Sequence, residues 1–206
     1  MTLPKLHIVV GSTRPGRVAK PIADWVVDRT TADGRFEVEL VDIADYDLPV
    51  LDEPHHPVLG KYENPHTLRW AAKIREADAF IFVMPEYNYG PPVALLNAFD
   101  YLGREWTYAP VAFVSYGGIA GGLRGVQVMK QIVTTVRMVP IPDGVVLPLV
   151  LQHLQTGEFV PPASAEPAFA PMLTELLRWA EALTALRAEG PPKPMLPPGP
   201  PPGPRP

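Results

Sequence analysis

The 206 residues of this sequence predict one α/β domain, a doubly wound, three-layer structure with five parallel strands between helices. Two observations carry this prediction. Short apolar runs, typical of strands covered on both faces, recur about five times along the chain. Between them lie segments whose apolar residues repeat every three or four positions, as on one face of a helix. Right-handed crossovers between such strands favour the order 2-1-3-4-5.

The apolar runs mark the expected strands. Two of them are apolar throughout, whereas the second in chain order alternates apolar and acidic residues before a more uniformly apolar end. Prolines blur the limits of the last one. The expected strands are residues 6–10, 36–43, 79–84 and 111–114, with a fifth at 145–151 or in the stretch before it from residue 138.

Helical spacing and capping residues mark the expected helices. Asn64-Pro65 is typical of a helix start, with asparagine as the N-cap and proline in the first turn. Pro92 is placed to open another helix. The five helices are expected around Val18 to Val26, from Pro65, from Pro92, around Val126 to Val136, and from about Pro167 to Arg187.

Composition narrows the class of protein. The chain is 47% hydrophobic and 19% charged, as expected of a globular domain, and no apolar run approaches the roughly 20 residues of a membrane helix. The absence of cysteine excludes disulfides, thiolate nucleophiles, iron–sulfur clusters and cysteine-built zinc sites. A net charge of -4 disfavours general affinity for nucleic acid. With no secretory signal in the sequence, we expect a cytoplasmic protein without a membrane or nucleic-acid partner.

Proline is concentrated at the end of the chain. Ten of the 28 prolines lie in residues 191–206, where few side chains are available for a packed core. We expect a folded domain over residues 1–189 and a proline-rich tail over 190–206 that is extended or disordered. An inert extension is the simpler interpretation of this tail, and a docking peptide for a partner is the alternative.

Ligands bind beyond the carboxyl ends of the strands in this kind of fold, which directs attention to three loops. The first, residues 11–17, holds two glycines, two hydroxyls and two arginines at the start of a helix, a combination suited to a phosphate. Its glycine spacing resembles that of a nucleotide-binding P-loop. However, Arg17 and Val18 stand where that loop needs lysine and a hydroxyl for the outer phosphates and magnesium. A monophosphate needs neither, and the alternative is a turn with surface arginines.

The other two loops suit a flat ring. Residues 85–92 place two tyrosines beside Asn88, whose amide offers both a donor and an acceptor. Residues 115–124 contain four glycines, which allow the main chain to approach a ligand closely. Each loop alone could be an ordinary turn or a flexible lid. Their occurrence at all three expected positions favours a binding site.

Other groups of residues give weaker evidence for a function. His55-His56 lies near Asp52 and Glu53, but adjacent side chains diverge, so we expect a solvated loop and no metal site. Neither a G-x-S-x-G elbow nor a G-x-G-x-x-G dinucleotide motif is present. The isolated His7, His66 and His153 are interpreted as structural, Trp25, Trp70 and Trp179 as core residues, and Trp106 as a loop residue near the ring site.

Together, the three loops resemble those of the NAD(P)H-dependent FMN reductases, a flavodoxin-like family that includes azoreductase- and quinone-reductase-type members. The likeness covers about residues 6–150. It rests on Gly11-Ser12-Thr13-Arg14 followed by Arg17, on Pro85-Glu86-Tyr87-Asn88, on Ser115-Tyr116-Gly117-Gly118, and on Asn97, Asp100 and Tyr101.

This resemblance implies FMN as cofactor, with NADPH or NADH as co-substrate, and a homodimer or tetramer with flavin near the subunit boundary. It implies that the phosphate is held by Ser12, Arg14, Arg17 and the neighbouring Val18 and Ala19. The ring would be lined by Pro85, Glu86, Tyr87 and Asn88 on one side and by Ser115, Tyr116, Gly117 and Gly118 on another. Tyr89 and the prolines after it depart from the family pattern, which leaves the acceptor open.

The expected activity is that of an FMN-dependent NAD(P)H oxidoreductase. It would pass two electrons by a ping-pong hydride mechanism to a small-molecule acceptor: a quinone, an azo compound, free flavin or a metal ion. Because the cofactor carries this chemistry, no catalytic side chain is predicted. One alternative is a flavodoxin-type electron carrier or redox sensor without NAD(P)H turnover, which the missing Thr/Ser-Gly-Thr phosphate loop disfavours. Another is a scaffold without cofactor whose tail recruits a partner.

Overall fold

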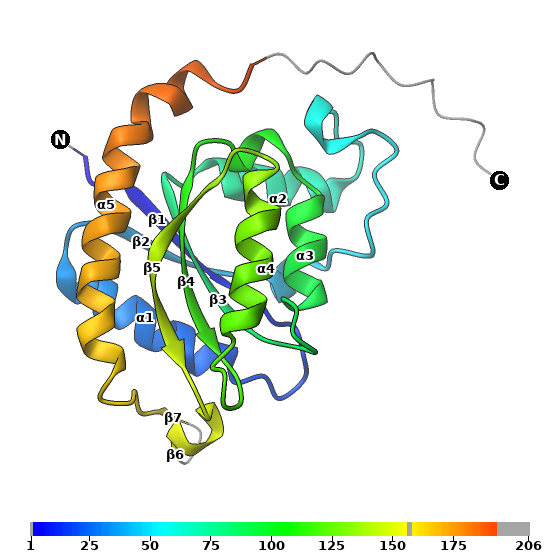
Figure 1. The fold of residues 1–206 in the computed structure, drawn as a ribbon. Coiled ribbons are helices and arrows are strands. Elements are labelled where there is room, and N and C mark those ends of the chain that lie inside the picture. The colour runs from blue at the N-terminus through cyan, green and yellow to red at the C-terminus, as the bar shows by residue number, and fades with distance from the viewer. Residues whose placement is uncertain (1, 156–157, 193–206) are drawn as a thin grey trace.

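The computed structural model describes residues 2–155 and 158–192 and contains the expected doubly wound sheet (Figure 1). Its five strands are all parallel and lie in the order β2-β1-β3-β4-β5. This confirms the predicted fold class and strand order. The strands are β1 (Lys5–Val10), β2 (Glu37–Asp42), β3 (Ala79–Pro85), β4 (Pro110–Tyr116) and β5 (Val139–Leu147).

Five α-helices cover the two faces of the sheet, with α1 and α5 on one side and α2, α3 and α4 on the other (Figure 1). Alternate residues of β1 enter different layers: Leu6 and Ile8 pack with α1 and α5, whereas Val9 packs with the other three helices. This is the period of two that a strand imposes. The helices are α1 (Ala19–Asp33), α2 (Pro65–Arg75), α3 (Val93–Asp100), α4 (Leu123–Thr134) and α5 (Ala165–Glu189).

Strand β5 explains why the last strand was hard to delimit from the sequence. It lies at the edge of the sheet, where Pro140 and Pro142 are tolerated. Its pairing with β4 shifts register between Val111 and Phe113. Gly144 lies at this irregularity, and a Cβ there would be 2.8 Å from the carbonyl oxygen of Phe113. The strand therefore begins near the earlier of the two expected positions.

Two residues singled out by the sequence, Asn97 on α3 and Tyr101 directly after it, hold a long loop in place. The Asn97 amide donates to the carbonyl of Pro49, and its oxygen accepts from the N–H of Leu51 at 2.9 Å. The Tyr101 hydroxyl is 2.9 Å from a carboxylate oxygen of Asp52. These contacts fix the segment after β2 against the side of α3.

The C-terminal helix ends at Glu189 and is followed by Gly190 with φ of 72°. Most of the predicted proline-rich tail, from residue 193 onward, lies outside the described residues. The boundary between domain and tail therefore stays a prediction. Among the helices described over residues 2–155 and 158–192, none is long and apolar enough to cross a membrane.

Candidate functional site

A cavity of about 550 Å³ opens at the carboxyl ends of the strands, where the three loops were expected to meet. Loops after β1, β3 and β4 all contribute to its wall, and so does the segment after β5. Its lining consists of Arg14, Gly16, Arg17, Val18, Pro85, Glu86, Tyr87, Tyr116, Gly117, Gly118, Leu149, Val150, Leu151 and Gln152.

The first loop begins with a close contact to β3. The N–H of Gly11 donates to the carbonyl of Val83, and a Cβ on Gly11 would be 3.1 Å from that oxygen, so glycine allows the close approach. Ser12 is buried, and its hydroxyl lies 3.1 Å from that of Tyr87. Arg14 is exposed at the cavity and has no side-chain partner within the described part of the chain. Its guanidinium is therefore available to an anion.

Arg17 lines the same cavity but is already paired. Its guanidinium forms an ion pair with Asp42 at the end of β2, and the other oxygen of Asp42 accepts from the N–H of Ala44. A guanidinium has five N–H donors, so this pairing leaves donors for a phosphate. Ala19, the first residue of α1, is fully buried and lies outside the cavity lining.

The second loop contains a strained turn. Tyr87 and Gly90 exchange backbone hydrogen bonds of 2.9 Å in both directions. Between them, Asn88 and Tyr89 have φ of 50° and 68°, which is costly for residues with side chains. Asn88 and Tyr89 are exposed to solvent, whereas Tyr87 lines the cavity and its hydroxyl reaches that of Ser12. Asn88 does not line the cavity itself, and its amide is exposed beside it.

The third loop is held from beneath. Ser115 is fully buried, and its hydroxyl donates to the carbonyl of Gly121, so it stabilises the conformation of the loop. Gly122 has φ of 87°, and a Cβ there would be 2.9 Å from atoms of Ser115 and Tyr116. Burial raises the pKa of the Tyr116 hydroxyl well above its ordinary value, so this group stays neutral at the cavity wall.

The segment after β5 completes the cavity and was missed by the sequence analysis. The N–H groups of Leu149 and Val150 donate to the carbonyls of Gly118 and Gly117, at 2.8 and 3.0 Å. Leu149 itself has φ of 49°. The available signal was its position at the carboxyl end of the fifth strand, the same rule that selected the other loops.

The expectation for Trp106 was wrong. This side chain is 1% exposed and lies at the other end of the sheet, between α3 and β4. It stacks on Phe99 and donates to its carbonyl at 3.1 Å. It is a core residue because the chain returns to the amino ends of the strands before β4 begins. A larger cavity, of about 820 Å³, lies at that end and contains none of the predicted site residues.

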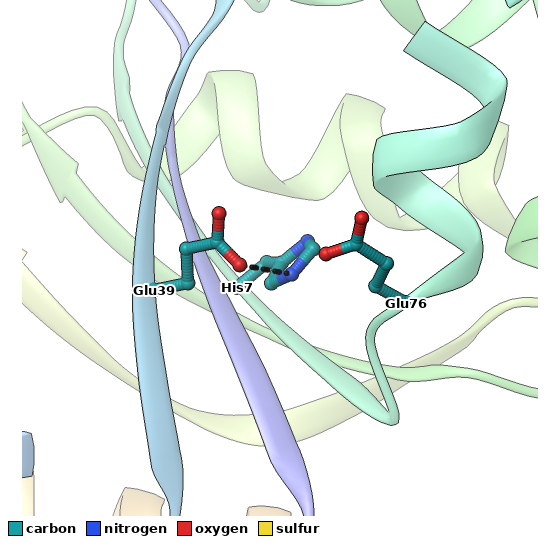
Figure 2. A group of neighbouring side chains, drawn as sticks. All are labelled: His7, Glu39 and Glu76. Carbon is teal, nitrogen blue, oxygen red and sulfur yellow. Dashed lines mark ion pairs between the residues drawn. The ribbon is translucent and has the colours of Figure 1, made fainter. Parts of the chain in front are cut away.

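A second cluster of titratable groups lies far from the cavity. His7 on β1 is fully buried, and its Nε2 is 3.3 Å from a carboxylate oxygen of Glu39, with Glu76 on the opposite side (Figure 2). Lys73 bridges the two carboxylates at 2.7 and 2.8 Å, and Lys5 is 3.1 Å from Glu76. Because these ammonium groups balance the carboxylates, we interpret the cluster as an ion-pair network and not as a metal centre.

The sequence places His55 and His56 near Asp52 and Glu53 and leaves His66 isolated, but the structure pairs these groups differently. His66, rather than His55 or His56, reaches Asp52, at 3.0 Å. His55 pairs with Glu63 at 3.2 Å. These three histidines do not form part of any metal-ligand group found among residues 2–155 and 158–192.

The fold and cavity define an α/β protein of the flavodoxin-like class, with a ligand site beyond the carboxyl ends of its parallel strands. A model of the NADPH-dependent FMN reductase family matches residues 4–150. The chain belongs to this family, as its loops predicted. The enzyme class, the FMN cofactor and the nicotinamide co-substrate expected from the sequence are those of the family.

Individual relatives support this assignment over part of their length. An NAD(P)H-dependent FMN reductase of Schizosaccharomyces pombe is 43% identical over 121 residues, which is 58% of this chain and 60% of that protein. An NAD(P)H:quinone oxidoreductase of Solanum tuberosum is 40% identical over 100 residues, 47% of this chain and 50% of that protein. The chain thus spans about half to three fifths of these relatives.

A solved structure shows the same fold. FerB of Paracoccus denitrificans, a flavoenzyme NAD(P)H:(acceptor) oxidoreductase, superposes with a TM-score of 0.69 at 21% identity, covering 87% of this chain and 98% of that one. At this identity the similarity concerns the fold alone.

Proposed function

We propose that this protein is an FMN-dependent NAD(P)H oxidoreductase that passes two electrons to a small-molecule acceptor. The observation that carries the proposal is the convergence of the three family motifs on one cavity, whose wall includes Arg14, a residue with no side-chain partner among those that the structure describes. Phosphate and ring would thus meet chemically different parts of one site.

The cavity residues fit FMN in their chemistry. Arg14 and Arg17 offer charge-assisted donors to the phosphate, together with the backbone around Val18 at the start of α1. The buried hydroxyl of Ser12 lies beneath this region. Pro85 and Tyr87 on one side and the main chain of Gly117 and Gly118 on the other would enclose the ring. The exposed amide of Asn88, beside the cavity, would meet the edge of the ring.

When bound, FMN supplies the chemistry by accepting a hydride from NAD(P)H and delivering two electrons to the acceptor. The protein's part is to bind, orient and exclude water. Exposed apolar side chains at the rim offer a surface for the planar parts of both substrates in turn, which suits a ping-pong scheme. They are Tyr89, Ile119, Leu149 and Leu151. No side chain of the cavity is required as acid or base.

The acceptor would be a flat or diffusible oxidant: a quinone, an azo compound, free flavin or a metal ion. A quinone is favoured because the Solanum tuberosum relative is an NAD(P)H:quinone oxidoreductase. We place the reaction in the cytoplasm, in keeping with the absence of cysteine.

A homodimer or tetramer is part of the proposal. Helices α3 and α4 cover the same face of the sheet (Figure 1), and both expose apolar side chains that a monomer would leave in water. Val93 is 76% exposed, Leu123 46% and Val128 38%. Sedimentation velocity should give the mass of two or four chains, and Val93→Lys should lower it. A wild-type protein that sediments as a monomer would contradict this part.

The function is tested with purified protein, FMN and NADPH. We expect FMN to bind, and NADPH to be oxidised when a quinone such as menadione is added, in proportion to bound FMN. Bound FMN with no oxidation of NADPH or NADH would favour an electron carrier or redox sensor. A failure to bind FMN at all would favour a scaffold.

A further inference from the structure

Glu86, directly after β3, lines the cavity, and its carboxylate contacts the start of α4. One oxygen accepts from the backbone N–H groups of Arg124 and Gly125, at 2.9 and 3.3 Å. The other lies 3.1 Å from the guanidinium of Arg124, and the side chain is only 10% exposed. Glu86 therefore caps the start of α4 from a different loop of the site.

The strained turn that follows Glu86 rests on the same end of α4. The guanidinium of Arg124 lies 4.7 Å from the centre of the Tyr89 ring. Gly125 is close enough to Gly90 that a Cβ there would be 3.0 Å from the carbonyl oxygen of Gly90. Because the turn contains two left-handed residues, such contacts are needed to hold its shape.

The contact between Glu86 and the start of α4 also sets the balance of charge beside the cavity. The start of α4 carries the positive end of the helix dipole, and Arg124 adds a full positive charge. The Glu86 carboxylate lies against both of them. Since Glu86 also lines the cavity, its negative charge is close to whatever the cavity binds. A bound group that becomes more negative on reduction would be sensitive to this balance.

Resting on the proposed function, we propose that Glu86 is a positioning residue with two effects. It holds the Tyr87–Gly90 turn on α4, and its charge offsets the start of α4 so that reduced FMN is bound less tightly than it otherwise would be. The protein would thereby keep bound FMN a stronger reductant toward its acceptors.

The test compares Glu86→Gln with Arg124→Gln. Gln retains an oxygen that can accept from α4 but lacks the charge, so reduced FMN should bind about three- to tenfold more tightly relative to oxidised FMN. A tenfold change equals about 30 mV in a two-electron reduction potential. Arg124→Gln should change the ratio in the opposite direction, and the double variant should return it close to that of wild type. A purely structural role would weaken both redox forms equally.

A matched control and a cofactor-free readout complete the test. Glu175→Gln removes a carboxylate from a surface ion pair with Arg178 on α5 and should leave the ratio unchanged. In the protein without FMN, Glu86→Ala, which removes the acceptor together with the charge, should speed amide hydrogen exchange at Tyr87, Gly90 and Gly125. Unchanged ratios in both Glu86→Gln and Arg124→Gln, or unchanged exchange, would overturn the corresponding half of this inference while leaving FMN binding intact. Wild-type protein that binds no FMN would instead overturn the proposed function, and the exchange result would still decide the positioning role.

Discussion

The hydroxyls of Ser12 and Tyr87 lie 3.1 Å apart, so the loops after β1 and β3 are joined beneath the cavity although 75 positions separate them in sequence. Both loops leave the sheet from neighbouring strands, since β1 pairs directly with β3. The contact shows how the fold brings the phosphate-type loop and the ring-type loop to one place.

Removal of this contact should be measurable in the absence of cofactor. Tyr87→Phe should lower the free energy of unfolding by about 0.5–1.5 kcal/mol, the usual value of one partly buried hydrogen bond. Tyr89→Phe is the matched control, because the Tyr89 ring is 69% exposed. Urea denaturation of both variants checks this. Equal losses in the two would show that the Tyr87 hydroxyl contributes nothing to the junction.

Arg14 is expected to carry much of the affinity for the FMN phosphate. Arg14→Ala should weaken FMN binding by about 1.5–3 kcal/mol, the range for a hydrogen bond to a charged group. Riboflavin, which lacks the phosphate, should bind wild type and variant alike. Fluorescence titration with both ligands measures the difference. If riboflavin lost as much affinity as FMN, Arg14 would contact the ring or the sugar and not the phosphate.

Replacement of Arg17 should affect stability as well as FMN affinity, because Arg17 also forms an ion pair within the protein. Arg17→Ala should weaken FMN by a similar amount, and it should also destabilise the protein without cofactor, since Asp42 then loses its ion-pair partner. Chemical denaturation of the unliganded variant, beside the FMN titration, separates the two effects. A variant with normal stability and normal FMN affinity would remove Arg17 from the site.

Gly122 should not tolerate a side chain. Its φ of 87° is unfavourable for alanine, and the added Cβ would meet three atoms at 2.9 Å, so Gly122→Ala should cost roughly 1–3 kcal/mol of stability. Gly118→Ala is the comparison within the same loop, because a Cβ there meets nothing within 4 Å. Thermal or urea unfolding of both variants decides the matter. Similar stability of the two would mean that the loop after β4 relaxes around the new methyl group.

The buried His7 should make stability depend on pH. Burial, and then the nearby Lys73 and Lys5, lower its pKa to about 4, while Glu39 and Glu76 act in the opposite direction. The unfolded chain binds the proton near pH 6.5, so between about 6.5 and 4 it holds more protons than the folded protein. Stability should therefore be complete above this window and fall as the pH is lowered through it, in total by on the order of 3 kcal/mol.

This dependence is checked by urea denaturation at pH 7 and pH 5. His7→Gln should lose less stability than wild type on acidification, because glutamine takes up no proton. His55→Gln, at a partly exposed surface ion pair, serves as the control and should follow wild type. An equally steep loss in His7→Gln would assign the effect to the surrounding carboxylates.

Much of the fold was predictable because strands and helices have different periods. The runs ending at Val10, Met84 and Val114 became neighbouring strands, and the rule that ligands bind beyond their carboxyl ends located the cavity. The start of β5 was not predicted with certainty, because Pro140 and Pro142 argue against a central strand. Proline is tolerated in β5 because this strand lies at the edge of the sheet.

The features of the site that the sequence did not predict depend on the direction in which individual side chains point and on the residues they contact. Trp106 was misplaced because residues between α3 and β4 can lie at either end of the sheet until the length of α3 is known. The carboxylate of Glu86 is used by α4, and the guanidinium of Arg17 by Asp42. Such contacts join residues 38 and 25 positions apart, and no local pattern in the sequence encodes them.

The central claim is that this protein binds FMN and reduces it with a nicotinamide. The most direct measurement is the visible spectrum of the protein with FMN under nitrogen, before and after NADPH or NADH is mixed in. Loss of the bound-flavin band within seconds, and its return when a quinone is added, is the result that this account predicts. A band that persists with both nucleotides would contradict it and would make the protein a flavin carrier or sensor.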